Sequence, residues 1–137
     1  MLFARACVFV LSACAGVTLA APAPEPEALS ELKARDMQGR GTVYQQLGAF
    51  GSCGQKHGDG DMIVAISNSF MKSRHNSPYC RKSIRARNKS NGKTVVVRVA
   101  DTCMGCGPND LDFSVGAWNR LTGNAPWGTF PVSWNWA

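Results

Sequence analysis

Two neighbouring stretches in the C-terminal third of the chain decide the fold: Val99-Ala100-Asp101-Thr102-Cys103-Met104-Gly105-Cys106-Gly107 and Asp110-Leu111-Asp112-Phe113-Ser114. The first stretch ends a valine-rich segment, 93–100, whose β-branched composition is typical of a strand. In the second stretch, Ser114 is a good helix N-cap, and apolar residues at helical spacing follow as far as Gly123. We therefore expect a strand, a short loop between two cysteines and one helix, in that order.

Further short strands are expected on both sides of this segment. The candidate strands are 41–46, 62–67, 83–87 and 130–136. Asn91-Gly92 is a tight-turn signal that would join the third of these to the valine-rich strand as a hairpin. In 130–136 the apolar residues alternate with polar residues or proline, as in a strand with one buried face. Several short strands with one helix favour a mainly β fold, a small closed barrel.

The N-terminal part of the 137-residue chain has a different character. Residues 1–20 are expected to be a secretory signal peptide, because Arg5 precedes an apolar run with small residues before Ala20. That run is shorter than the roughly 20 apolar residues that a membrane span prefers. The Pro-rich segment 21–40 is expected to be a linker or pro-segment, with processing after Arg35 or Arg40 as an option. We therefore expect one folded domain over 41–137.

Four of the six cysteines belong to this domain, because Cys7 and Cys14 lie in the expected signal peptide. The four are Cys53, Cys80, Cys103 and Cys106. An even number in a small exported domain predicts two disulfides, and three pairings are open. We favour Cys53–Cys80 with Cys103–Cys106. The first would close a long loop and contribute about 3–4 kcal/mol.

Two other uses of the cysteines are disfavoured. Cys103 and Cys106 have the spacing of a redox motif, but no βαβ pattern surrounds them. A zinc site with His57 and His75 would lack a second close cysteine pair. We therefore expect no metal and no cofactor.

The charge of the chain is unevenly distributed. The formal net charge is +6, and no acid interrupts the basic residues between 62 and 100, which are Lys72, Arg74, Arg81, Lys82, Arg85, Arg87, Lys89, Lys93 and Arg98. A basic face of this kind attracts polyanions. For an exported protein we favour an anionic polysaccharide or a cell surface over nucleic acid, with a plain solvated surface as the alternative.

Three acids follow the basic stretch: Asp101, Asp110 and Asp112. Carboxylates gathered at a groove suit binding of sugar hydroxyls, or acid–base chemistry on a glycosidic bond. In the alternative, both acids have structural roles: Asp112 is an anion favoured by the dipole at the start of a helix, and Asp101 stabilises a turn. Among the four tryptophans, Trp127 in a Pro-Trp-Gly loop is the candidate for an exposed ring that stacks on sugars.

The motifs together resemble one family. They are Gly41-Thr42-Val43-Tyr44, Gly51-Ser52-Cys53-Gly54, Asp61-Met62-Ile63-Val64-Ala65-Ile66-Ser67, Tyr79-Cys80 and the two stretches quoted at the outset. This combination resembles the RlpA-like double-psi β-barrel, or barwin-like, family, and in particular the short secreted fungal proteins akin to expansin domain 1, the loosenins. The resemblance covers 41–137.

The resemblance implies a six-stranded double-psi β-barrel with an open polysaccharide groove. It places Asp101, Thr42 and Tyr44 along the groove, and it makes Asp112 the key acid for wall loosening. Family glucanases carry a second catalytic acid where this chain has Gln45 and Gln46.

We therefore expect a secreted, extracellular and monomeric protein that binds cell-wall polysaccharide and loosens walls without hydrolysis. It would bind no nucleic acid, and no membrane after signal removal. Two alternatives are open: a glycan-cleaving enzyme with Asp112 as its catalytic acid, and a protease inhibitor or effector. Cellulose, chitin, pectin and peptidoglycan are all open as the polymer.

Overall fold

The structure is a computed structural model that describes Gly16 and residues 35–137. Apart from Gly16, the expected signal peptide over 1–20 lies outside the described residues, as do Cys7 and Cys14. The same is true of residues 21–34 of the expected linker.

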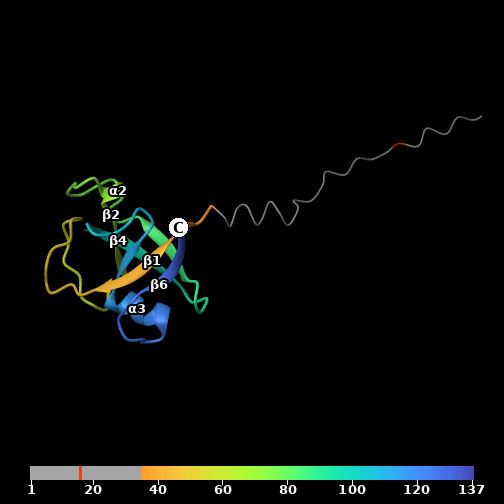
Figure 1. Ribbon diagram of the computed structural model, residues 1–137. Coiled ribbons are helices and arrows are strands. Elements are labelled where there is room, and N and C mark those ends of the chain that lie inside the picture. Colours follow the sequence, from red (N-terminus) through yellow and green to blue (C-terminus); the bar gives the residue numbers. More distant parts are fainter. Residues whose placement is uncertain (1–15, 17–34) are drawn as a thin grey trace, which may run out of the picture.

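Six strands close into a barrel in the order β1-β5-β2-β4-β3-β6 (Figure 1). The strands are β1 (Met37–Tyr44), β2 (Ile63–Ser67), β3 (Ser83–Asn88), β4 (Thr94–Cys103), β5 (Leu111–Ser114) and β6 (Phe130–Trp136). β1 pairs with β5 and β2 pairs with β4 in parallel, whereas the other neighbours are antiparallel. The expected small closed barrel is confirmed.

Two helices accompany the strands. α3 (Val115–Thr122) lies at the lower end of the barrel in Figure 1, and the single turn α2 (Asn68–Met71) lies at the upper end. α3 begins after Ser114, whose hydroxyl accepts a hydrogen bond from the backbone N–H of Ala117. It ends at Gly123, which is left-handed with φ 67°. The predicted helix is confirmed, whereas α2 and the short strand β5 were not predicted.

β1 begins earlier than the sequence indicates. Residues 37–40, which we expected in the linker, pair with β6 along the side of the barrel. Gly39 is required there, because a Cβ at this position would lie 2.1 Å from the backbone oxygen of Asn109. Processing after Arg35 would leave all of β1 in place, whereas processing after Arg40 would remove half of the strand.

Alternate side chains of β3 and β6, and of the first part of β4, fill the barrel interior, and β2 is buried along its whole length. Trp118 of α3 and Trp134 of β6 are almost fully buried, and Trp118 packs against Phe130 at a ring-centroid distance of 5.3 Å. The Trp134 indole donates to the backbone oxygen of Asn109 at 2.8 Å, which satisfies its N–H in the core. No helix within residues 35–137 has the length and apolar character needed to cross a membrane.

Both expected disulfides are present. Cys53–Cys80 ties the long β1–β2 loop to the segment before β3. Cys103–Cys106 closes the loop between β4 and β5. The second bridge thus lies between Asp101 of β4 and Asp112 of β5 along the chain.

Candidate functional site

Strand register brings two of the predicted acids into one row. Ala65 of β2 pairs with Asp101 of β4 on one side and with Asp112 of β5 on the other. Asp112 in turn pairs with Thr42 of β1. Because neighbouring strands lie about 4.8 Å apart, the Cα atoms of the two aspartates are roughly 10 Å apart. Ala65, which stands between the two aspartates in this row, is buried.

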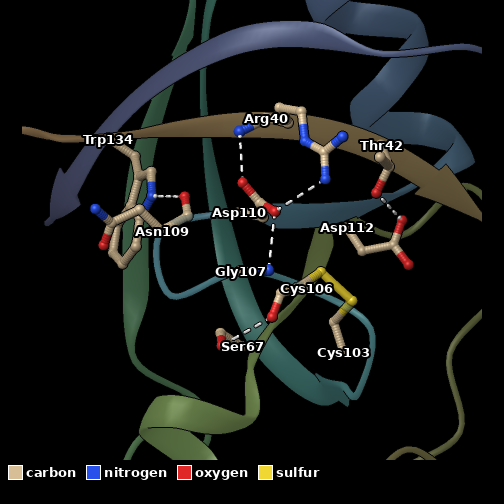
Figure 2. Close-up of polar contacts among 10 residues, drawn as sticks. All are labelled: Arg40, Thr42, Ser67, Cys103, Cys106, Gly107, Asn109, Asp110, Asp112 and Trp134. Atoms are coloured by element: carbon tan, nitrogen blue, oxygen red, sulfur yellow. Dashed lines mark hydrogen bonds and ion pairs between the residues drawn. A yellow bond between two sulfur atoms is a disulfide. The ribbon is translucent and has the colours of Figure 1, made fainter.

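Asp112 is the most deeply placed acid of this row. Its Oδ1 accepts a hydrogen bond of 2.7 Å from the Thr42 hydroxyl (Figure 2). Burial raises the pKa of Asp112, and the nearby charge of Asp101 raises it further, although the bond from Thr42 acts in the opposite direction. Asp112 therefore holds a proton more readily than an exposed aspartate does.

Asp101 is held in place by the backbone. Its Oδ1 accepts hydrogen bonds from the N–H groups of Ser52, at 2.9 Å, and Thr102, at 2.8 Å. The hydroxyls of Ser52 and Thr102 lie 2.8 Å apart and form their own bond. A depression of about 310 Å³ opens beside Asp101 and is lined also by Arg74 and His75. The row of acids thus continues into a hollow on the surface.

Two buried polar groups beside the acids lack partners. Among the described residues, the Tyr44 hydroxyl and the side-chain nitrogen of Gln46 have no hydrogen bond. Burial raises the pKa of Tyr44, the neighbouring Gln46 side chain lowers it, and the charges of Asp101 and Asp112 raise it further. A buried polar group without a partner costs about 1–3 kcal/mol, and these two groups lie close enough together for Gln46 to lower the pKa of Tyr44.

Asp110 has a different role from the other two acids. It accepts hydrogen bonds from the backbone N–H groups of Arg40, at 2.8 Å, and Gly107, at 2.9 Å, and the Arg40 guanidinium lies 3.6 Å away (Figure 2). Burial opposes the charge of Asp110, but these contacts outweigh it and lower the pKa. Asp110 therefore fastens the disulfide loop to β1, and its carboxylate is occupied by the protein itself.

Trp127 is exposed, at 53%, as the Pro-Trp-Gly motif indicates. The loop that carries it borders a depression shared with Asn88 and Asn91 at the β3–β4 turn. Asn88 and Asn91 both donate to the backbone oxygen of Leu121 in α3. The structure therefore places this loop beside α3 and the β3–β4 turn, and no described contact links it to the acids. A sugar-binding role for Trp127 stays a prediction.

Sequence reasoning missed three residues of the site. Gln46 was considered only as an absent acid, and Ser52 and Thr102 were not considered as supports of Asp101. The available signal was Gly51, where a Cβ would lie 2.4 Å from the backbone oxygen of Ala100. The Gly-Ser-Cys-Gly motif thus marks a loop that must approach the end of β4 closely.

Solved structures share this arrangement of strands. The Streptomyces papain inhibitor is 28% identical, with a TM-score of 0.64 over 75% of this chain and 94% of that chain. The Clavibacter michiganensis expansin is 29% identical, with a TM-score of 0.58 over 74% of this chain and 50% of that chain. The domain is a double-psi β-barrel. The fungal elicitor cerato-platanin shares the fold at 15% identity and a TM-score of 0.53, over 72% of this chain and 91% of that chain.

The double-psi barrel also has a curated relative. It is 29% identical over 86 residues to ripening-related protein 6 of Oryza sativa subsp. japonica, which is 60% of this chain and 50% of that protein. The chain thus spans about half the length of this relative and of the expansin. No family model matches the chain. The resemblance to expansin-like double-psi barrels that the motifs indicated is confirmed.

Proposed function

We propose that the protein is an extracellular, non-hydrolytic polysaccharide-binding protein that loosens cell-wall glycans in the manner of the loosenins. The observation that carries this proposal is the row of Thr42, Asp112 and Asp101, with the unpartnered groups of Tyr44 and Gln46 beside it. An open row of acceptors and donors on one side of a barrel suits a chain of sugar hydroxyls.

Each group of the row has a defined part in binding. Asp112 and Asp101 accept hydrogen bonds from sugar hydroxyls, and the Tyr44 hydroxyl and the Gln46 amide donate to sugar oxygens. These bonds replace the partners that Tyr44 and Gln46 lack in the free protein. When Asp112 bonds to one glycan chain, it weakens the contacts between that chain and its neighbour, and the two chains slip.

The arrangement argues against hydrolysis. Both stereochemical routes of glycoside hydrolysis need a pair of carboxyl groups with separate roles. Asp110 is bound to Arg40 and Gly107, and glutamines occupy positions 45 and 46, where the family glucanases carry a second catalytic acid. Asp112 therefore has no acid partner at that position.

A β-glucan chain is the first ligand to test. A mutant of the Clavibacter michiganensis expansin, 26% identical to this chain with a TM-score of 0.58, was solved in complex with cellohexaose. That ligand was bound by a protein twice the length of the shared domain, so the polymer for this chain needs its own measurement.

The test is a pull-down against insoluble cellulose and chitin, which carry no acidic sugars, with analysis of sugars released into the supernatant. The wild-type protein should be retained by one polymer without releasing soluble oligosaccharide. Asp112→Ala should be retained several-fold less, whereas Asp36→Ala, with the same loss of charge, should be retained like the wild type. Release of oligosaccharide that is abolished in Asp112→Asn would instead support a glycan-cleaving enzyme.

The papain inhibitor favours a second candidate function, because the match covers 94% of that chain. Leu47 and Phe50 in the β1–β2 loop are 82% and 69% exposed, as an inhibitory loop would require. If the protein is an inhibitor, it should block papain at equal concentration. Leu47→Ser with Phe50→Ser should then abolish inhibition, while Asp112→Ala should leave it unchanged.

A further inference from the structure

A second groove lies between β3 and β6, where the start of β1 also contributes. Its volume is about 670 Å³, and three cations line it: Arg85, Arg87 and Lys89. Uncharged hydrogen-bonding side chains stand between them, and Trp136 forms part of the wall. The three cations belong to the acid-free basic stretch of the sequence, whereas none of the predicted sugar-binding residues lines this groove.

Strand geometry sets the cations in a line. On β3, Ile84, Ala86 and Asn88 are buried, so Arg85 and Arg87 point outward from alternate positions. The Cα atoms of such positions are roughly 7 Å apart. β6 places Asn135 opposite Arg85 and Ser133 opposite Arg87. Each of the two arginines is thus paired across the strands with a side chain that can bond a hydroxyl group.

These cations are not neutralised by the protein. Within residues 35–137, neither Arg85, Arg87 nor Lys89 takes part in an ion pair. Asp36 is the single acid of the groove, and its carboxylate accepts a bond of 3.1 Å from the Asn135 amide. Like charges held close together on one face repel each other, and a bound polyanion removes that repulsion.

The groove is also separate from the row of acids. In the closed strand order, two strands lie between β3 and β5 in either direction. β3, which carries Arg85 and Arg87, is therefore on the opposite side of the barrel from Asp112. A polymer bound at one face leaves the other free.

We propose that the groove binds a linear polymer of acidic sugars. Arg85, Arg87 and Lys89 pair with successive carboxylates, Ser133 and Asn135 bond to the hydroxyl groups between them, and the Trp136 ring contacts a sugar face. The two disulfides are typical of an oxidising, extracellular setting, where acidic polysaccharides are the common polyanions. Because the groove is distinct from the row of acids, the protein can link an acidic polymer to the glycan of the proposed function.

The test measures binding to polygalacturonic acid by affinity electrophoresis. The triple variant Arg85→Gln, Arg87→Gln and Lys89→Gln should bind roughly tenfold more weakly, because it loses three exposed ionic contacts. The control variant, Lys56→Gln with Lys72→Gln and Arg120→Gln, loses the same charge outside the groove and should bind like the wild type. Wild-type binding should weaken as salt is added.

Several results would overturn the proposal. Equal weakening of both triple variants would show that net charge alone binds the polymer. Tighter binding to single-stranded DNA or to phosphatidylserine vesicles, at about 0.15 M salt, would assign the groove to another polyanion.

The single variant Arg87→Gln should show a smaller loss of binding in the same direction. It provides the test if the triple variant does not fold. Asp112→Ala should bind polygalacturonic acid normally, so failure of the proposed function at Asp112 is distinguishable from failure here.

Discussion

Asp112 is the residue on which the proposed function depends, and its surroundings disfavour the ionised form of its carboxyl group. Burial and the charge of Asp101 both raise its pKa. A carboxyl whose pKa rises on folding is a cost to the folded state at any pH above its value in the unfolded chain. An aspartate at this position therefore lowers the free energy of unfolding, while it places a carboxyl group beside Tyr44 and Gln46.

Asp112→Asn should accordingly stabilise the protein while weakening polysaccharide binding. The asparagine oxygen can still accept the bond from Thr42, and it carries no charge. We expect a rise in Tm of about 2 °C near pH 7. The advantage should shrink as the pH falls through the raised pKa of Asp112, and it should vanish below about pH 3.9, the value for an unfolded aspartate. Thermal unfolding followed by circular dichroism across this pH range checks both the sign and the window.

A difference in Tm that is independent of pH would contradict this account, because a packing effect has no titration. Asp36→Asn, which removes the same charge outside the row of acids, is the control.

At the scale of elements, α3 depends on one serine. The Ser114 hydroxyl accepts from the Ala117 N–H and donates to the backbone oxygen of Asp61, which fastens the helix start to the end of the β1–β2 loop. Ser114→Ala removes both bonds at a buried position. The free energy of unfolding should fall by about 1–2 kcal/mol.

Urea unfolding measures this loss, and Ser90→Ala, at an exposed position in the β3–β4 turn, is the matched control. An unchanged midpoint for Ser114→Ala would show that the cap does not anchor the helix.

The elements that could be predicted are those with a signal in their own sequence. β4 has a run of valines, α3 has a cap and an apolar face, and the β3–β4 hairpin has Asn91-Gly92. β5 has only four residues, and it is a strand because β1 and β2 lie on either side of it. Residues about 45 to 70 positions earlier in the chain thus decide its conformation, and no local pattern reports this.

The candidate site, too, has parts with a local sequence signal and parts that depend on distant residues. The acids could be predicted because they cluster around the disulfide loop in the sequence. The separation of Asp110 from Asp112 could not, because it rests on Arg40, which is 70 residues away in the chain. The unpartnered groups of Tyr44 and Gln46 likewise depend on packing between strands.

At the scale of the whole molecule, one bridge joins distant loops. Cys53–Cys80 spans 27 residues, whereas Cys103–Cys106 spans 3. The chain-entropy estimate gives about 3.5 kcal/mol for the longer loop and about 1.5 kcal/mol for the shorter one. Replacing Cys53 and Cys80 with serine should therefore lower the unfolding free energy about twice as much as replacing Cys103 and Cys106. Denaturant unfolding of the two variants compares them directly, and the opposite order would refute the ranking.

The barrel as a whole separates two kinds of charge. The row of acids lies around β5, and the cations of the second groove lie around β3 on the opposite side. Sequence showed the two charge groups, and closure of the barrel assigned them to different faces. Under the two proposals, one barrel binds two polymers on different faces.

The most direct test of the central claim, that the row of Thr42, Asp112 and Asp101 binds a glycan chain, is an amide NMR titration. The ligand is a soluble oligosaccharide of whichever polymer retains the protein. The account predicts shift changes centred on Tyr44, Gln46, Asp101 and Asp112, with no ligand cleavage, and their loss in Asp112→Ala. Shift changes centred elsewhere, or unchanged in that variant, would contradict it.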